Sequence, residues 1–219
     1  MIVLRDIYKY YKEQIVLRGV SCVFEEGNVY GIYGMSGSGK TILLQMILGF
    51  SIPNNGTISV NGELLHKDIP FMEDVGYSIG EMNFLPQYDC YENLKQLGMA
   101  KYSSEDINQS LDRVGLSSSV KVQDYTPDMK QKLNLAQAIC HQPGVVLLDE
   151  PTIDLNAEGK KCFWNIVDQE RKRGAIVIIT MREPDELRQH CGQVFELKDG
   201  FLELQSNDSE KESWERNSL

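Results

Sequence analysis

The chain has 219 residues and a formal net charge of −10 at pH 7, which argues against a basic face that binds nucleic acid. Its five cysteines are scattered and lack CxxC spacing, so we expect reduced thiols rather than a disulfide framework or a zinc site. The sequence shows no signal peptide and no apolar run of about 18 residues, the length of a membrane-spanning helix. Contact with a membrane is therefore expected through a partner, without direct insertion of this chain.

Three segments in the first part of the chain, 2–7, 16–25 and 56–60, alternate between apolar and polar residues. This period is typical of half-buried strands, and Asn61-Gly62 supplies a turn signal after the last of them. We expect the three to form an antiparallel β lobe. The shorter apolar segment Asn28–Tyr33 instead reads as a buried strand.

A phosphate-binding loop pattern, G-x-x-x-x-G-K-[ST], follows this buried strand and precedes the apolar helix expected over 42–49. A strand, a glycine-rich turn and a helix start together surround a polyphosphate with backbone N–H groups. We expect Lys40 to neutralise the β- and γ-phosphates and the Thr41 hydroxyl to bind Mg²⁺. The alternative is a glycine-rich turn with an incidental lysine. The expected nucleotide-binding residues of the loop are Gly34, Met35, Ser36, Gly37, Ser38, Gly39, Lys40 and Thr41.

A helical insertion is expected next, because more chain separates Lys40 from Asp149 than one crossover helix needs. Apolar residues recur at helical spacing in 90–101, 104–115 and 126–141. Ser103 offers N-cap chemistry to the second of these helices, and Thr126 with Pro127 is a strong start for the third. His141 follows that helix, where we expect it to pair with the helix dipole.

A second apolar run, Val145–Leu148, ends in the carboxylates Asp149 and Glu150. In an α/β sheet this pattern is typical of a buried strand that brings acids to the ligand-binding edge. We expect Asp149 to hold Mg²⁺ and Glu150 to deprotonate the attacking water. The remaining expected elements are a helix over 156–173, a strand over 175–180, a hairpin of 194–197 with 201–204, and a polar, disordered tail over 206–219.

The order of these motifs resembles the nucleotide-binding domain of an ATP-binding cassette (ABC) transporter, over about residues 1–204. The resemblance implies an α/β fold: a P-loop NTPase core with a mostly parallel sheet, an antiparallel β lobe and a helical subdomain at roughly 84–141. We therefore expect one domain over 1–205. Tyr11 resembles the aromatic residue that stacks on adenine in the family. Further matches are Gly34–Thr41 to Walker A, Val145–Glu150 to Walker B, Tyr91–Leu94 to the start of the helical subdomain, and Met129–Ala138 to the helix behind the signature.

The family signature, L-S-G-G-Q/M, is altered to Tyr125-Thr126-Pro127-Asp128-Met129. In the family this segment approaches the γ-phosphate held by the opposite subunit. Pro127 has no N–H to offer, and the Asp128 carboxylate would repel a phosphate. We expect the start of this helix to be occupied by the Asp128 carboxylate of the same chain. Each ATP site of a symmetric dimer would then be capped by Pro127 and Asp128 from the other copy, so that the dimer closes poorly on ATP.

Other positions of the family pattern also differ. Near the family's Q-loop glutamine stand Gly80 and Glu81, and Glu81 is the candidate substitute, which would join Thr41 and Asp149 at Mg²⁺. By register, the family's switch histidine is replaced by Arg182. Arg182 either reaches the γ-phosphate as a bidentate cation or is a surface residue of a loop. Asn156 stands where the family usually has aspartate in the loop after Walker B.

Two functions remain open from the sequence alone. The first is an ATP-binding subunit that binds Mg-ATP and hydrolyses it slowly to power transport through a transmembrane subunit. The second is a nearly non-hydrolytic, regulatory half of a heterodimeric complex. Both imply ATP and Mg²⁺ as cofactors, a second nucleotide-binding domain as partner, and a place at the cytoplasmic face of the membrane. A small-molecule kinase fits less well, because no acceptor-binding region is evident.

Overall fold

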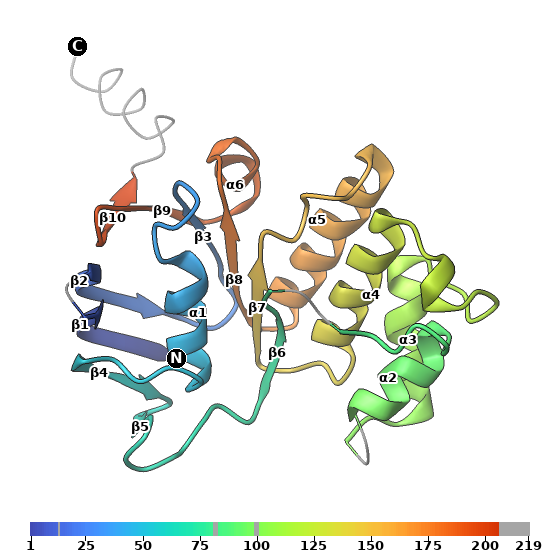
Figure 1. Cartoon of the computed structure of the whole chain (residues 1–219), viewed down its shortest axis with the longest axis horizontal. Coiled ribbons are helices and arrows are strands. Elements are labelled where there is room, and N and C mark those ends of the chain that lie inside the picture. The colour runs from blue at the N-terminus through green and yellow to red at the C-terminus, as the bar shows by residue number, and fades with distance from the viewer. Residues whose placement is uncertain (13, 81–82, 99–100, 206–219) are drawn as a thin grey trace.

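The computed structural model describes residues 1–12, 14–80, 83–98 and 101–205. The tail over 206–219 lies outside these residues. Two sheets and six α-helices make up the described part of the chain, in the α/β arrangement that the sequence predicts (Figure 1). The strands are β1 (Ile2–Tyr11), β2 (Gln14–Phe24), β3 (Val29–Tyr33), β4 (Asn55–Val60), β5 (Glu63–Leu64), β6 (Val75–Ser78), β7 (Val145–Asp149), β8 (Ile176–Met181), β9 (Gln193–Lys198) and β10 (Phe201–Gln205). The helices are α1 (Lys40–Leu48), α2 (Cys90–Gly98), α3 (Ser104–Val114), α4 (Pro127–Ile139), α5 (Ala157–Lys172) and α6 (Asp185–His190), with a 3-10 turn, η1, at Val122–Asp124.

The smaller sheet is the expected antiparallel lobe, in the order β2-β1-β4-β5. The larger sheet has the order β10-β9-β3-β8-β7-β6. Its strands run parallel except for β10, which pairs with β9 as the predicted hairpin. The expectation of a mostly parallel sheet beside an antiparallel lobe is therefore confirmed.

Alternate residues of the larger sheet face two separate cores, as the period of a strand requires. On β7, Val145 and Leu147 pack with α1 and the antiparallel lobe, whereas Val146 and Leu148 pack with the helices of the insertion. Figure 1 shows this division, with α1 beside β1, β2 and β4, and α2–α5 on the other side of β7. Each face of the sheet is covered, which explains why its central strands are mostly apolar.

Helix α4 approaches β6 very closely at Gly76. A Cβ atom at this position would lie 1.6 Å from the carbonyl oxygen of Ala138 on α4. Only glycine permits this contact, which sets the helical insertion directly against the edge of the large sheet.

Helix starts follow the predicted cap residues. Ser103 accepts from the Asp106 amide and forms a capping box at α3, and Thr126 accepts from the Met129 amide at 3.2 Å at the start of α4. The dipole role expected for His141 is not seen, because both ring nitrogens are buried without a hydrogen-bond partner among the described residues, and burial lowers the pKa of the ring. Its ring instead stacks on Tyr102, with the centroids 5.4 Å apart. All five cysteines are free thiols, as expected.

Candidate functional site

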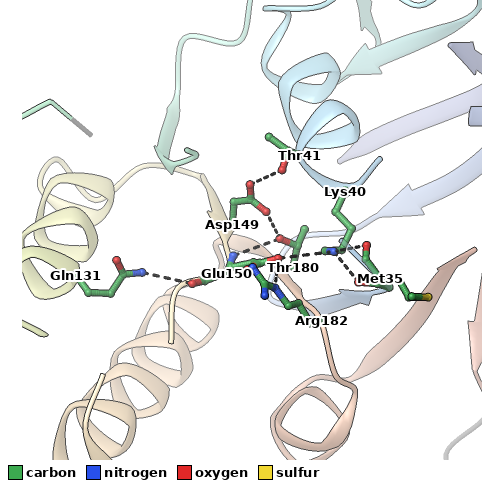
Figure 2. A network of polar contacts seen from close by, with 9 residues as sticks. Met35, Lys40, Thr41, Gln131, Asp149, Glu150, Thr180 and Arg182 are labelled. Carbon is green, nitrogen blue, oxygen red and sulfur yellow. Dashed lines mark hydrogen bonds and ion pairs between the residues drawn. The ribbon is translucent and has the colours of Figure 1, made fainter. Parts of the chain in front are cut away.

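Three parallel strands bring the predicted site together, because β3, β7 and β8 end at the same edge of the large sheet. The phosphate-binding loop follows β3, Glu150 follows β7, and Arg182 follows β8. Figure 2 shows side chains from all three places turned toward one another. The geometry thus joins residues that are far apart in the sequence into one cluster.

Lys40 begins α1 and is only 5 % exposed. Its ammonium group is folded back into its own loop, where it donates to the carbonyl oxygens of Gly34 at 2.6 Å and Met35 at 3.2 Å (Figure 2). Burial lowers the pKa of Lys40 from its usual value, while the negative charges of Glu150 and Asp149 act in the opposite direction. The loop therefore carries a buried amine at its centre, beside two carboxylates.

The rest of the loop has room and unused polar groups for a phosphate. Ser38 Oγ is buried and has no hydrogen-bond partner among the described residues. A Cβ atom at Gly37 would meet nothing within 4 Å, so the turn is open on that side. A hollow of about 510 Å³ lies beside the loop, between β2 and the β9–β10 hairpin. Buried polar atoms normally have partners, so Ser38 Oγ fits an external ligand.

Asp149 joins the loop to the end of β8. The Thr41 hydroxyl donates to Asp149 Oδ2 at 2.6 Å, and the hydroxyl of the fully buried Thr180 donates to Asp149 Oδ1. A hydroxyl and a carboxylate are oxygen ligands of the kind that Mg²⁺ prefers. In the part of the chain that the structure describes, no cluster of three or more His, Cys, Asp or Glu side chains could hold a metal. The donor set therefore fits a magnesium ion that takes its other ligands from phosphate and water.

Glu150 occupies an unusual backbone conformation, with φ at 48°. Its amide donates to the Thr180 carbonyl at 3.0 Å, which fixes the turn after β7. Arg182 Nε contacts both carboxylate oxygens of Glu150, at 3.2 and 3.0 Å, and Lys40 Nζ lies 3.8 Å from Oε1. Positive φ in a residue other than glycine costs energy and is concentrated at functional sites. The structure thus sets a strained, charge-paired carboxylate beside the phosphate-binding loop.

Comparison with known proteins agrees with this geometry. The family model described as "ABC transporter" matches residues 17–153, which is more than half of the chain. This chain belongs to the ABC transporter family. An uncharacterised ABC transporter ATP-binding protein of Bacillus subtilis, YybJ, is 44% identical over 207 residues, covering 93% of this chain and 95% of that protein. A second from the same organism, YdbJ, is 33% identical, covering 87% of this chain and 64% of that protein.

Solved ABC structures share the fold. An ATP-binding subunit of an ABC transporter has a TM-score of 0.85 at 21% identity, covering 98% of this chain and 93% of that one. The dimeric cassette MJ0796 has a TM-score of 0.83 at 21% identity, covering 94% and 99% respectively. The fold class predicted from the sequence is therefore confirmed as that of an ABC cassette.

Other residues that the ABC resemblance singled out have no hydrogen bond to the cluster among the described residues or lie outside the described structure. Tyr11 ends β1, is half exposed and has the ammonium group of Lys9 over its ring, 5.0 Å from the centroid. Tyr11 does not line the hollow beside the phosphate-binding loop. Glu81 lies outside the described residues, so its relation to Asp149 stays a prediction.

Two members of the cluster were not predicted from the sequence. Thr180 is the one polar residue of β8, next to its last residue Met181, and this single polar residue in a buried run was the available signal. Gln131, on the helix behind the altered ABC signature, donates to the Glu150 carbonyl at 3.5 Å. Nothing in the local sequence indicates that contact, because it depends on how α4 packs against the end of β7.

Proposed function

We propose that this chain is the ATP-binding subunit of an ABC transporter, which binds Mg-ATP at Gly34–Thr41 and hydrolyses it slowly. The observation that carries this proposal is the convergence of Lys40, the Thr41–Asp149 pair and Glu150 at one edge of the sheet. An amine, a set of magnesium ligands and a carboxylate base are the groups that phosphoryl transfer to water requires.

Each group has a role set by its chemistry. Lys40 neutralises the β- and γ-phosphates, while Thr41 and Asp149 hold Mg²⁺, together with Glu81 in place of the family's glutamine. The bound metal supplies positive charge to the phosphate oxygens. Glu150 accepts a proton from the attacking water. Tyr11 stacks on the adenine ring.

Slow turnover follows from two departures from the family pattern. The Glu150 carboxylate is paired with Arg182, whose guanidinium occupies part of the carboxylate that the attacking water must reach. Movement of the guanidinium to the γ-phosphate would free the carboxylate to act as a base. The second departure is Pro127, which gives the start of α4 no N–H for a phosphate held by another copy.

The proposed partners are a transmembrane subunit and a second nucleotide-binding domain, which would place this chain at the cytoplasmic face of the membrane. Support comes from family membership, from a relative named as a macrolide export ATP-binding/permease protein of Bdellovibrio bacteriovorus, 26% identical, and from the dimeric cassette MJ0796. Within the described ranges, no helix is long and apolar enough to cross a membrane. The net charge of −10 disfavours nucleic acid as a partner.

Glu150→Gln tests the proposal directly. The amide keeps the shape of the carboxylate but cannot accept the proton, so hydrolysis should slow by about 10²-fold or more while ATP binding stays nearly unchanged. Single-turnover hydrolysis, with the chain in excess over ATP, measures even a slow rate. If the wild type binds ATP without measurable hydrolysis, the nearly non-hydrolytic alternative replaces the proposal. Measurable turnover that is equal in the wild type and Glu150→Gln would move the catalytic role to another residue.

A further inference from the structure

The Asp128 carboxylate is bound on both sides by groups of its own chain. Its Oδ1 accepts from the backbone amide of Asn156 at 3.1 Å, and its Oδ2 pairs with Lys132 Nζ at 2.9 Å. The two side chains are only 18 % and 21 % exposed. The pair has the favourable order for a helix, with the acid one turn before the base. A carboxylate held in this way is directed into the chain, not toward a ligand outside it.

Two helix starts meet at this carboxylate. Asp128 lies in the first turn of α4, and Asn156 is the N-cap of α5, where its side chain accepts from the Gly159 amide at 2.8 Å. Helix N-termini carry partial positive charge, so both favour an anion between them. Burial acts to raise the pKa of Asp128, but the hydrogen bonds from Lys132 and Asn156 outweigh it and lower the pKa from its usual value.

The fit around the carboxylate is tight. A Cβ atom at Gly159 would lie 2.9 Å from Asp128 Oδ1 and 3.3 Å from two carbon atoms of the Leu155 side chain. The absence of a side chain at Gly159 therefore leaves the space that the carboxylate fills.

The segment from Glu150 to Asn156 is held by α4 at both ends. Asp128 accepts from the Asn156 amide. One turn further along the helix, Gln131 donates to the Glu150 carbonyl at 3.5 Å, and Figure 2 shows this second contact. Inside the segment, the Ile153 amide donates to the Glu150 carbonyl and the Leu155 amide to the Thr152 carbonyl. The base at one end of the segment is thus connected to Asp128 through a short, hydrogen-bonded loop.

We propose that Asp128 is a positioning residue for ATP hydrolysis, which anchors the 150–156 segment to α4 and so fixes the place of Glu150. The inference rests on the proposed function, since it assigns a role to Asp128 in that reaction. It reverses the expectation that Asp128 acts by repelling a phosphate held by another copy. Removing the carboxylate should therefore slow hydrolysis, whereas relief of repulsion would speed it.

Three variants separate the parts of this contact. Asp128→Ala removes both bonds of the carboxylate. Asp128→Asn keeps an oxygen for the Asn156 amide but loses the charge pair with Lys132. Asp112→Ala changes an exposed aspartate of α3 and is the matched control.

The first measurement is hydrogen exchange of the Asn156 amide in the full chain, which needs no hydrolysis. We expect protection to fall by about tenfold or more in Asp128→Ala, the scale of one hydrogen bond to a charged acceptor, and to be largely kept in the other two variants. The second is single-turnover hydrolysis at saturating ATP, with ATP affinity measured in parallel. Asp128→Ala should hydrolyse about tenfold more slowly at unchanged affinity, and Asp128→Asn should recover most of the rate.

Gly159→Ala tests the same contact without changing Asp128. Its methyl group would displace the carboxylate, so hydrolysis should slow in the wild-type background and not slow further in Asp128→Ala. An Asp128→Ala chain that hydrolyses ATP as fast as the wild type, or faster, would overturn the proposal. If the wild type shows no turnover that depends on Glu150, the proposed function is overturned instead. The hydrogen exchange of the Asn156 amide would still report whether Asp128 anchors the 150–156 segment.

Discussion

Replacement of Lys40 by alanine gives the most direct measure of the phosphate-binding loop. In this structure the ammonium group makes two hydrogen bonds to loop carbonyls, from Gly34 and Met35. A bound triphosphate would replace at least one of these hydrogen bonds. The contribution of Lys40 to the free energy of ATP binding is therefore the energy of its phosphate contact minus that of the carbonyl contact it gives up. We therefore expect Lys40→Ala to lose about one charged hydrogen bond, about 1.5–3 kcal/mol.

This loss corresponds to a weakening of Mg-ATP binding by roughly 10- to 150-fold. Isothermal titration calorimetry on the full chain measures it, and Lys130→Ala, at an exposed position on α4, is the control for a lost positive charge. Circular dichroism should accompany the titration, because the variant also removes the partner of two loop carbonyls. Equal ATP affinity for a folded Lys40→Ala chain and the wild type would refute the assignment of the loop.

Three further predictions follow from other contacts. Arg182→Met should weaken binding of ATP but not of ADP if the guanidinium reaches the γ-phosphate; equal effects on both nucleotides in competition titrations would leave Arg182 as a partner of Glu150 alone. Pro127→Gly, in a Glu150→Gln background, adds back an N–H and should strengthen ATP-dependent dimerisation in sedimentation runs; no gain would show that the missing donor is not what limits closure. The half-buried His141 has both ring nitrogens inside the protein near Lys101, Asp74, Asp106, Arg173 and Tyr102, and its pKa is lowered from 6.5, mainly by burial. Because the His141 imidazole binds a proton more readily in the unfolded chain, its contribution to the stability of the fold should be full above about pH 6.5 and fall below it. The difference between the urea midpoints at about pH 7.5 and 5.5 should therefore be smaller for His141→Phe than for the wild type.

Much of the fold could be predicted from local patterns. The strand–loop–helix unit at Gly34–Thr41, the caps Ser103 and Thr126, and the apolar run ending at Asp149 all depend on neighbouring residues, so the sequence shows them directly. Helix α6 was missed because its six residues are almost all polar and carry no apolar period. The expectation for His141 failed for a similar reason, since a position after a helix indicates a dipole contact but does not show that the ring nitrogens are buried without partners.

The site was predicted less completely, because its decisive contacts are tertiary. Arg182 and Glu150 are separated by 32 positions, and their pairing depends on β7 and β8 lying side by side. The contact of Asp128 with Asn156 depends in the same way on two helix starts meeting. Sequence reasoning identified the acid at the start of α4 but expected it to repel a phosphate, and its partners Asn156 and Lys132 became visible only in the folded chain.

The contact between Gly76 and Ala138 bears on how this cassette can be recombined with others. A chimera that takes its helical region from one protein and its sheet from another would set a foreign helix backbone against a foreign strand at the point where no side chain fits. Exchange of 75–139 as one block keeps β6 and α4 matched, whereas a crossover between them invites a collision of backbones. Exchangeable units in this chain are therefore defined by where two backbones touch, and the boundary between sheet and helices is a poor place to cut.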